Sequence, residues 1–524
     1  MGKEIGIDLG TTNTVVSYVN KNGKLRQLRY DNEKIIPSVI YFHSQNEYFI
    51  GSKAKKFLEQ NPEAGVKNFK TTMGDSEKHE IIPEEGKPFS LRSREITKLF
   101  LNKIVRGMEN KLIKEFGIAD GCIDHAIITV PAKFSSTQKG ETRRAAREAG
   151  LDNVKLFAEP TAAAIAYEDS QGDEIDDSVI LVYDFGGGTF DVSIIQRKHN
   201  TFEEISAGGD KYLGGNILTE KLVEEVLELV NQDNGMEMPI NEEDFDEDEQ
   251  GISLTHYRLN MSEIRRATNL VKERLSEEEE ATEHCNIWLP GEESILYKIV
   301  FTREELENYI RDYVDRTIQI TINTIKEARD KGVENIDQIV LAGGSSNIPL
   351  VKERLEECLQ NQEVVFCDDV DTLISRGAAV IARKNNIVSK GITNVQMGIA
   401  AREGLQFARF QTIIPEDEPL PCTRKRIFWL SEDNQQKLNI EYYERDIKNY
   451  PKATRITDNG IEQIDTLIID NLPSNLKADD TMVEVEFTAQ KDGSLDIHVD
   501  LKDKSGVQIA HSDKINCVKK SDLE

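Results

Sequence analysis

Short apolar runs alternate with longer amphipathic segments from residue 5 to about residue 384. Runs such as IGIDLG, NTVVSYV, HAIITVPA, VILVYDFG and QIVLAGG, bounded by Gly or Pro, are typical of buried strands. Other segments place apolar residues three or four positions apart, which is typical of amphipathic helices. Helices are predicted over 136–150, 214–232 and 303–332. This part of the chain is therefore predicted to be mixed α/β.

The pattern changes after the linker-like stretch at 385–395. Short alternating segments such as FARFQTII, RKRIFWL, KLNIEYYE, MVEVEFTA and SLDIHVDLKD are separated by the turn signals EDNQ and KDGS. Alternation with period two predicts an antiparallel all-β domain, here over 396–515. The predicted order is an α/β domain over 1–384, a linker over 385–395, the β domain and a tail over 516–524, with no helical domain after the last strand.

Composition excludes several classes of protein. The chain has 524 residues, of which 38% are hydrophobic and 30% charged, and its longest apolar runs are too short to span a bilayer. No secretory signal precedes the first predicted strand, so a cytoplasmic location is expected. The six cysteines form no C-x-x-C pair, which argues against a disulfide framework or a zinc ribbon. Cys122 and His125 have metal-like spacing, but no second pair accompanies them, and the other histidines are scattered.

The net charge is −29, from 94 acidic and 65 basic residues. Phosphate groups would be repelled, so nucleic acid is not an expected partner. Part of the excess lies in NEEDFDEDEQ (241–250) and SEEEEATE (276–283). Both are expected to be solvated loops, with docking of a basic partner as the alternative.

Two loops repeat one pattern, in IGIDLGTTNT near the start and in VYDFGGGTFDVS at 182–193. Each has an apolar strand, an aspartate, one apolar residue, a glycine and then hydroxyl residues. Glycines let backbone approach a ligand closely, and successive N–H groups bind anions, while a strand-end carboxylate can hold Mg²⁺ through water. Two such hairpins facing each other would hold the phosphates of a nucleotide. The alternative is a pair of ordinary Gly-rich hairpins.

Other nucleotide-binding patterns do not fit. No G-x-x-x-x-G-K-[ST] occurs, and neither repeated loop leads into a helix as a dinucleotide-binding loop does. Two further diglycine turns, in SAGGDKYLGGN (206–216) and LAGGSSNIP (341–349), could bring backbone close to phosphate, ribose or base.

Seven segments in order resemble the seventy-kilodalton heat-shock protein family of chaperones: IGIDLGTTNT, VPAKFSSTQ, FAEPTAAAIAY, VYDFGGGTFDVS, GGDKYLGGN, FTREELE and IVLAGGSSNIP. The resemblance implies an actin-like (ribonuclease H-like) two-lobed ATPase domain, followed by a β-sandwich that binds peptides. It also implies ATP or ADP with Mg²⁺ as ligands, with K⁺ as a further candidate cation.

The resemblance assigns roles position by position. Lys70 and Glu159 are the expected catalytic pair, together with Asp8, Asp184 and Thr189, while Pro131 matches a proline that switches between nucleotide states. The metal shell is expected to be held, largely through water, by Asp8, Asp184 and Asp191. The expected nucleotide contacts are Gly10, Thr11, Thr12, Asn13, Gly186, Gly187, Gly188, Gly214, Gly215, Asn269, Lys272, Ser276, Gly343, Gly344, Ser345 and Asp371.

The sequence also departs from the family pattern. Glu273 and Asn347 stand where many members have arginines that stack on adenine, so adenine is predicted to be held more weakly, with a dissociation constant for ATP above the sub-micromolar range. Arg402 and Ser431 are less apolar than the usual arch over the peptide. The linker is reduced to NNIVSKG, and without a helical lid peptide exchange is expected to be fast. The predicted groove residues, for which the alternative is sandwich core, are Met397, Ile399, Phe428 and Leu438.

The expected function is ATP-dependent binding of exposed apolar segments of client proteins. A J-domain co-chaperone and a nucleotide-exchange factor are candidate partners, whereas nucleic acid and membrane are not. Two alternatives stay open on the residues. One is a nucleotide-binding regulatory or scaffold protein that has lost client binding, and the other is a sugar kinase or actin-type filament protein. The β domain argues against the second alternative.

Overall fold

The computed structural model describes residues 4–514, except 21, 76, 117–122, 133, 172–176, 292, 360–363, 366–369, 385–386, 394, 402–407 and 448–449. The first large sheet has the strand order β11-β10-β1-β2-β3, with β4 also paired to β2. Its strands are β1 (Glu4–Leu9), β2 (Asn13–Val19), β3 (Leu25–Gln27), β4 (Ile35–Pro37), β10 (His125–Val130) and β11 (Val154–Ala158).

The second large sheet repeats this topology in the order β18-β17-β12-β13-β14, with β19 added at the edge. In both sheets a central strand is antiparallel to the next strand and parallel to a later one: β1 with β2 and β10, and β12 with β13 and β17. The repeated loop thus lies at the same place in each sheet. These strands are β12 (Asp177–Phe185), β13 (Phe190–Lys198), β14 (Thr201–Asp210), β17 (Gln338–Ala342), β18 (Val364–Val365) and β19 (Val388–Lys390).

Two helices rich in small residues, α4 (Glu159–Gln171) and α10 (Val370–Arg383), pack against each other and against the two sheets. A Cβ added at Gly377 of α10 would lie 1.8 Å from the Ala162 carbonyl oxygen of α4, so only glycine permits this approach. Ser17 of β2 and Ser375 of α10 share a buried hydrogen bond of 2.8 Å. The strands that flank the two repeated loops, β1 and β2 in one sheet and β12 and β13 in the other, thereby pack against one common helix pair.

The three predicted helices are confirmed as α3 (Ser136–Glu148), α5 (Gly215–Asn234) and α8 (Arg303–Asp330). Helices α3 and α8 each begin with a capping box. The Ser135 or Thr302 hydroxyl accepts from the backbone N–H three residues later, and the side chain of that later residue accepts from the N-cap backbone N–H. The remaining helices of this part are α1 (Gly51–Gln60), α2 (Ser93–Phe116), α6 (Glu247–Gln250), α7 (Leu254–Arg274) and α9 (Pro349–Cys358). The small peripheral sheets contain β5 (Val39–Phe42), β6 (Tyr48–Ile50), β7 (Gly65–Lys67), β8 (His79–Ile81), β9 (Phe89–Leu91), β15 (Glu280–Trp288) and β16 (Ser294–Thr302).

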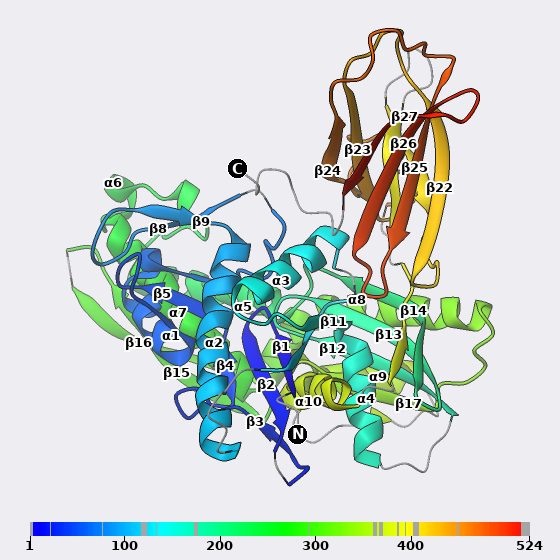
Figure 1. The fold of residues 1–524 in the computed structure, drawn as a ribbon. Coiled ribbons are helices and arrows are strands. Elements are labelled where there is room, and N and C mark those ends of the chain that lie inside the picture. The colour runs from blue at the N-terminus through cyan, green and yellow to red at the C-terminus, as the bar shows by residue number, and fades with distance from the viewer. Residues whose placement is uncertain are drawn as a thin grey trace.

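From Gln396 onward the described chain is antiparallel strands, which project from one side of the α/β part (Figure 1). They form two four-stranded sheets, β21-β20-β23-β24 and β22-β25-β26-β27, around one apolar core that includes Ile399, Tyr442, Phe487 and Val499. The strands are β20 (Gln396–Ala401), β21 (Arg409–Ile414), β22 (Cys422–Trp429), β23 (Leu438–Arg445), β24 (Ile461–Ile469), β25 (Thr481–Ala489), β26 (Leu495–Asp503) and β27 (Gln508–Lys514). The predicted tail at 516–524 lies outside the described residues.

The segment between the two parts is not a free linker. Strand β19 pairs in parallel with β14, and the Val388 backbone N–H donates to the Asn200 carbonyl oxygen at 2.9 Å. The β part also contacts α3 directly: the Ser136 N–H donates to Glu444 Oε1 at 2.9 Å, and Arg143 forms an ion pair with Asp492. The sequence did not predict this strand, because a run with only two apolar residues carries too little pattern.

Candidate nucleotide-binding and catalytic site

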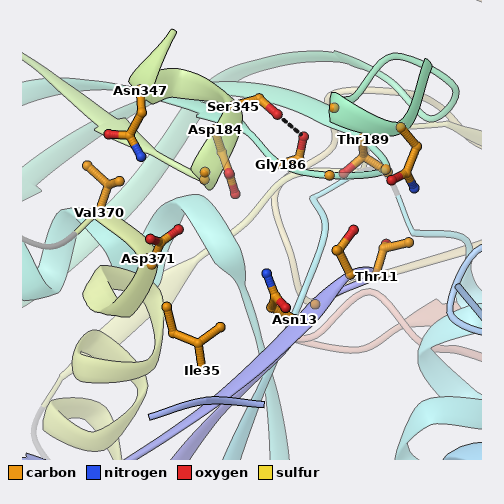
Figure 2. A pocket seen from close by; sticks show the side chains of 18 of the residues that line it. Thr11, Asn13, Ile35, Asp184, Gly186, Thr189, Ser345, Asn347, Val370 and Asp371 are labelled. Atoms are coloured by element: carbon orange, nitrogen blue, oxygen red, sulfur yellow. Dashed lines mark hydrogen bonds between the residues drawn. The ribbon is translucent and has the colours of Figure 1, made fainter. Parts of the chain in front are cut away.

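The two repeated loops lie against each other at the mouth of a deep cavity. A Cβ added at Gly187 would lie 2.1 Å from Thr12 Oγ1, and one at Gly188 would lie 2.8 Å from Thr11 Cγ2. The glycines therefore allow the second loop to touch the hydroxyl residues of the first. Figure 2 shows Thr11 and Asn13 facing Asp184, Gly186 and Thr189 across the opening.

The cavity has a volume of about 540 Å³ and is bordered by most of the expected nucleotide and catalytic residues. Among them are both loops, Lys70, Glu159, Gly215, Asp371 and the adenosine-side residues of α7. Gly214 supports the second loop from behind, since its Cβ position lies 2.5 Å from the Gly188 carbonyl carbon. Asp191 borders an adjoining cavity of about 730 Å³ with Lys70 and Pro131.

Sequence reasoning missed the apolar and amide part of the wall. Ile35, Val370, Ile374 and Ile348 border the cavity, as does Asn216. Isolated apolar residues carry no motif, so nothing in the sequence marked them. Asn216 and Ile348 did have a signal, because they follow the diglycine turns at 214–215 and 343–344.

Several carboxylates gather negative charge at the floor of the cavity. Burial and the nearby Glu159 carboxylate raise the pKa of Asp8 to about 7. Burial, followed by Glu159 and Asp191, raises the pKa of Asp184 well above its usual range. Lys70 Nζ donates to Glu159 Oε1 at 2.8 Å, and both side chains are buried. One lysine does not balance this set of acids, so the donor atoms suit a hard divalent cation such as Mg²⁺.

The diglycine turn after β17 fixes the second loop. Gly343 has φ of +79°, and a Cβ there would lie 2.5 Å from Asp184 Oδ1, so only glycine fits. Ser345 Oγ donates to the Gly186 carbonyl oxygen at 2.9 Å, the dashed line in Figure 2. The Gly215 N–H also donates to the Gly186 carbonyl oxygen, at 2.9 Å, so two donors from neighbouring elements hold this carbonyl in place.

The end of the cavity where adenosine is predicted to bind is built by α7 against the start of α5. Lys272 Nζ donates to the Gly215 carbonyl oxygen and to Thr219 Oγ1, each at 2.8 Å. Burial lowers the pKa of Lys272 to about 8. Asn269 Nδ2 donates to Glu273 Oε1 at 2.8 Å, and Glu273 and Asn347 both border the cavity. Positions 273 and 347, where the resemblance leads one to look for arginines, therefore present a carboxylate and an amide to the cavity.

The four predicted groove residues lie in or against the β core. Met397 and Ile399 are buried in it, while Phe428 and Leu438 are partly buried and pack against it. Ser431 is exposed, and Arg402 lies outside the described residues. Ile427 and Trp429 of β22 are about half exposed, at 51% and 52%. Both the groove assignment and the core alternative therefore stay predictions.

Comparison with known proteins identifies the family. A sequence model of the Hsp70 protein family matches residues 4–523. The chain is 28% identical over 528 residues to the chaperone protein DnaK of Mycoplasmopsis agalactiae, covering 96% of this chain and 80% of that protein. It is 30% identical over 451 residues to the chaperone protein DnaK of Thermotoga neapolitana, covering 84% and 70%. The chain belongs to the Hsp70 family.

Membership of this family defines the activity. The chain is an ATP-dependent molecular chaperone, and its enzymatic activity is ATP hydrolysis. Proteins of the family bind ATP and ADP together with Mg²⁺ and bind unfolded client polypeptides. Within the part of the chain that the structure describes, no helix has both the length and the apolar character needed to cross a membrane.

Proposed function

We propose that the cavity between the repeated loops binds ATP with Mg²⁺ and hydrolyses it, and that strands β20–β27 hold extended apolar client segments. One observation carries the proposal: two apposed glycine–threonine loops, the Asp8 and Asp184 carboxylates and the Lys70–Glu159 pair border a single cavity. Ordinary hairpins would have no reason to collect buried, mutually repelling acids.

Asp8, Asp184 and Asp191 are the residues proposed to hold the metal shell, largely through water. Bound there, Mg²⁺ supplies positive charge that offsets the phosphate oxygens and the acids. Asp184 and Asp191 are direct register partners on β12 and β13, so both project from one hairpin. The raised pKa values of Asp8 and Asp184 support this role, because a cation is what such buried acids lack.

Lys70 and Glu159 are proposed to act as a pair beside the γ-phosphate. The Lys70 ammonium stabilises negative charge that develops during transfer to water. Glu159 begins α4 directly after β11, and its bond to Lys70 Nζ fixes the ammonium in position. The Thr189 and Thr12 hydroxyls provide further donors at the same opening.

We further propose that residues up to 384 form an actin-like ATPase domain, that 385–395 is the coupling segment, and that 396–515 is the peptide-binding sandwich. The repeated sheet topology supports the first assignment, and the β14–β19 pairing supports the second. A cytoplasmic location, K⁺ as an additional cation, and J-domain and nucleotide-exchange partners are proposals of the same kind.

Steady-state ATP hydrolysis, with and without an extended apolar peptide, tests the proposal. Removal of one such charged group costs about 100- to 1,000-fold in rate, so Lys70→Ala is expected to lose most turnover. Lys53→Ala is the matched control, because Lys53 is an exposed lysine whose Nζ lies over the Phe49 ring, away from the cavity. Turnover that survives in Lys70→Ala would contradict the catalytic assignment. Turnover that peptide never changes would favour the regulatory alternative.

A further inference from the structure

Four titratable side chains form a compact block on the solvent face of the β26–β27 pair, far along the chain from the nucleotide cavity. In the antiparallel register, His498 lies opposite Asp513 and Asp500 lies opposite His511. His498 and Asp500 are two residues apart on one strand, as are His511 and Asp513 on the other, so all four share one face. The histidine ring centroids lie 4.4 Å apart.

Three of these residues bring ligand atoms close to one another. One nitrogen or oxygen of each of His498, Asp500 and His511 lies within 4.8 Å of the others. Asp500 Oδ1 is 2.9 Å from His511 Nδ1 and 3.7 Å from His498 Nε2. Ligand atoms about 2.1 Å from a tetrahedral zinc ion lie about 3.4 Å from one another, so these separations already bracket the required value.

We propose that His498 Nε2, His511 Nδ1 and Asp500 Oδ1 form a site for a divalent transition metal of the zinc type. Two imidazoles and one carboxylate are ligands that zinc takes in open three-ligand sites, with water as the fourth ligand. Mg²⁺ and Ca²⁺ prefer oxygen ligands and are not expected to bind there.

The outer contacts of the block are those that a metal site needs. Asp513 accepts from the other nitrogen of each ring, from His498 Nδ1 through Oδ1 and from His511 Nε2 through Oδ2 at 2.9 Å. A carboxylate that accepts from the outer N–H of a ligating histidine fixes its tautomer and ring orientation. Lys502 Nζ lies 3.2 Å from Asp500 Oδ2, which leaves Oδ1 toward the histidines. Asp513 and Lys502 are therefore positioning residues.

The alternative explanation is ordinary cross-strand pairing of opposite charges, which would give two independent His–Asp pairs. Such pairing does not require Asp513 to contact both His498 Nδ1 and His511 Nε2, as it does here. A bound ion would fasten β27 to β26. Strand β27 is the last strand of its sheet, so the ion would stabilise an edge that is otherwise held from one side.

Calorimetric titration with Zn²⁺ tests the proposal. The untagged full-length chain is first saturated with Mg²⁺ and ADP, so that the carboxylates of the nucleotide cavity are occupied. Co²⁺ is a second probe, because its visible absorption reports tetrahedral nitrogen and oxygen ligands. We expect one zinc equivalent per chain and no competition from a large excess of Mg²⁺. The His498→Ala/His511→Ala double variant is expected to lose this equivalent, and Asp513→Asn to weaken binding by about 10- to 100-fold.

His199→Ala is the matched control, because the His199 ring lies 3.7 Å from Asp177 and is 81% exposed, a surface His–Asp pair without a second histidine. It is expected to leave zinc binding unchanged. Absence of a zinc equivalent in the wild type would overturn the proposal, as would full binding by the double variant. Asp500→Asn keeps the size of the side chain but removes the charge of the proposed ligand, so it is expected to weaken zinc binding. Circular dichroism shows whether each variant is folded, which separates loss of a ligand from a folding defect.

Discussion

At the scale of single residues, the buried acids set a pH dependence in the protein without metal or nucleotide. The pKa of Asp8 is raised to about 7 by burial and by Glu159, whereas an unfolded chain releases this proton near pH 4. Between these values the folded state binds more protons than the unfolded state. The stabilising contribution is therefore complete below about pH 4 and is lost as pH rises through about 7.

The Asp8→Asn variant tests this sign, because asparagine cannot ionise. We expect the melting temperature of the wild type, measured in EDTA without nucleotide, to fall relative to that of Asp8→Asn between pH 5 and pH 8. The relative change is expected to correspond to about 2–3 kcal/mol, because about two pH units lie between pH 5 and the raised pKa and each unit corresponds to about 1.4 kcal/mol. Asp479→Asn, which changes an exposed aspartate of the β part, should show no such trend. Parallel curves for the wild type and Asp8→Asn would contradict the assignment.

Adenine affinity is a second property of single residues. Glu273 borders the cavity and accepts from Asn269. In the proposed binding mode its carboxylate takes the position from which a cationic side chain could stack on the base. Glu273→Arg is expected to tighten ATP binding roughly two- to fivefold, the effect of about 0.5–1 kcal/mol from a cation over an aromatic face. Calorimetry with ATP measures it. Glu280→Arg makes the same charge change at an exposed position on β15, so equal tightening there would indicate long-range charge instead.

At the scale of elements, the sequence was sufficient to predict a helix or strand wherever the periodic apolar pattern lies within the segment itself. Helix α5 begins at Gly215 and ends at Asn234, close to the predicted 214–232, because its apolar face and the following Gly235 are both visible in sequence. Strand β19 carries no such signal, since its pairing depends on the edge of β14. The His–Asp block of β26 and β27 was missed for the same reason: four residues spread over 498–513 become neighbours only through strand register.

The β14–β19 pairing makes a prediction about coupling. Val388→Pro removes the N–H that donates to Asn200, while Val388→Ala keeps it and removes only a side chain that is 45% exposed. We expect Val388→Pro to keep basal ATP hydrolysis and to lose its response to peptide, and Val388→Ala to retain both. Faster hydrogen exchange along β14 in the proline variant would locate the cause. An unchanged peptide response in Val388→Pro would show that coupling bypasses this strand.

At the scale of the whole molecule, the motifs predicted that residues of both loops would meet, because the repeated strand–loop–strand units and a shared ligand require it. They did not predict how the β part would lie on the α/β part. That arrangement depends on pairs such as Ser136 with Glu444 and Arg143 with Asp492, which are unremarkable polar residues in sequence. Arg143 is only 11% exposed and Asp492 only 19%, so the contact excludes much of the solvent.

The turn between β25 and β26 contacts α3 through the Arg143–Asp492 ion pair and the hydrogen bond from Arg143 to Ser494 Oγ. Asp492→Arg places like charges together and is expected to release the β part, which would increase the radius of gyration measured by small-angle X-ray scattering. The exchanged pair, Arg143→Asp with Asp492→Arg, is expected to restore compactness with a coupling energy of about 0.5–3 kcal/mol. Asp479→Arg changes the same charge at an exposed site and should leave the radius unchanged. If Asp492→Arg does not increase the radius of gyration, the two parts are held together by other contacts, among them the Ser136–Glu444 hydrogen bond and the β14–β19 strand pairing. If the exchanged pair stays as expanded as Asp492→Arg, attraction between these two charges is not what closes the contact.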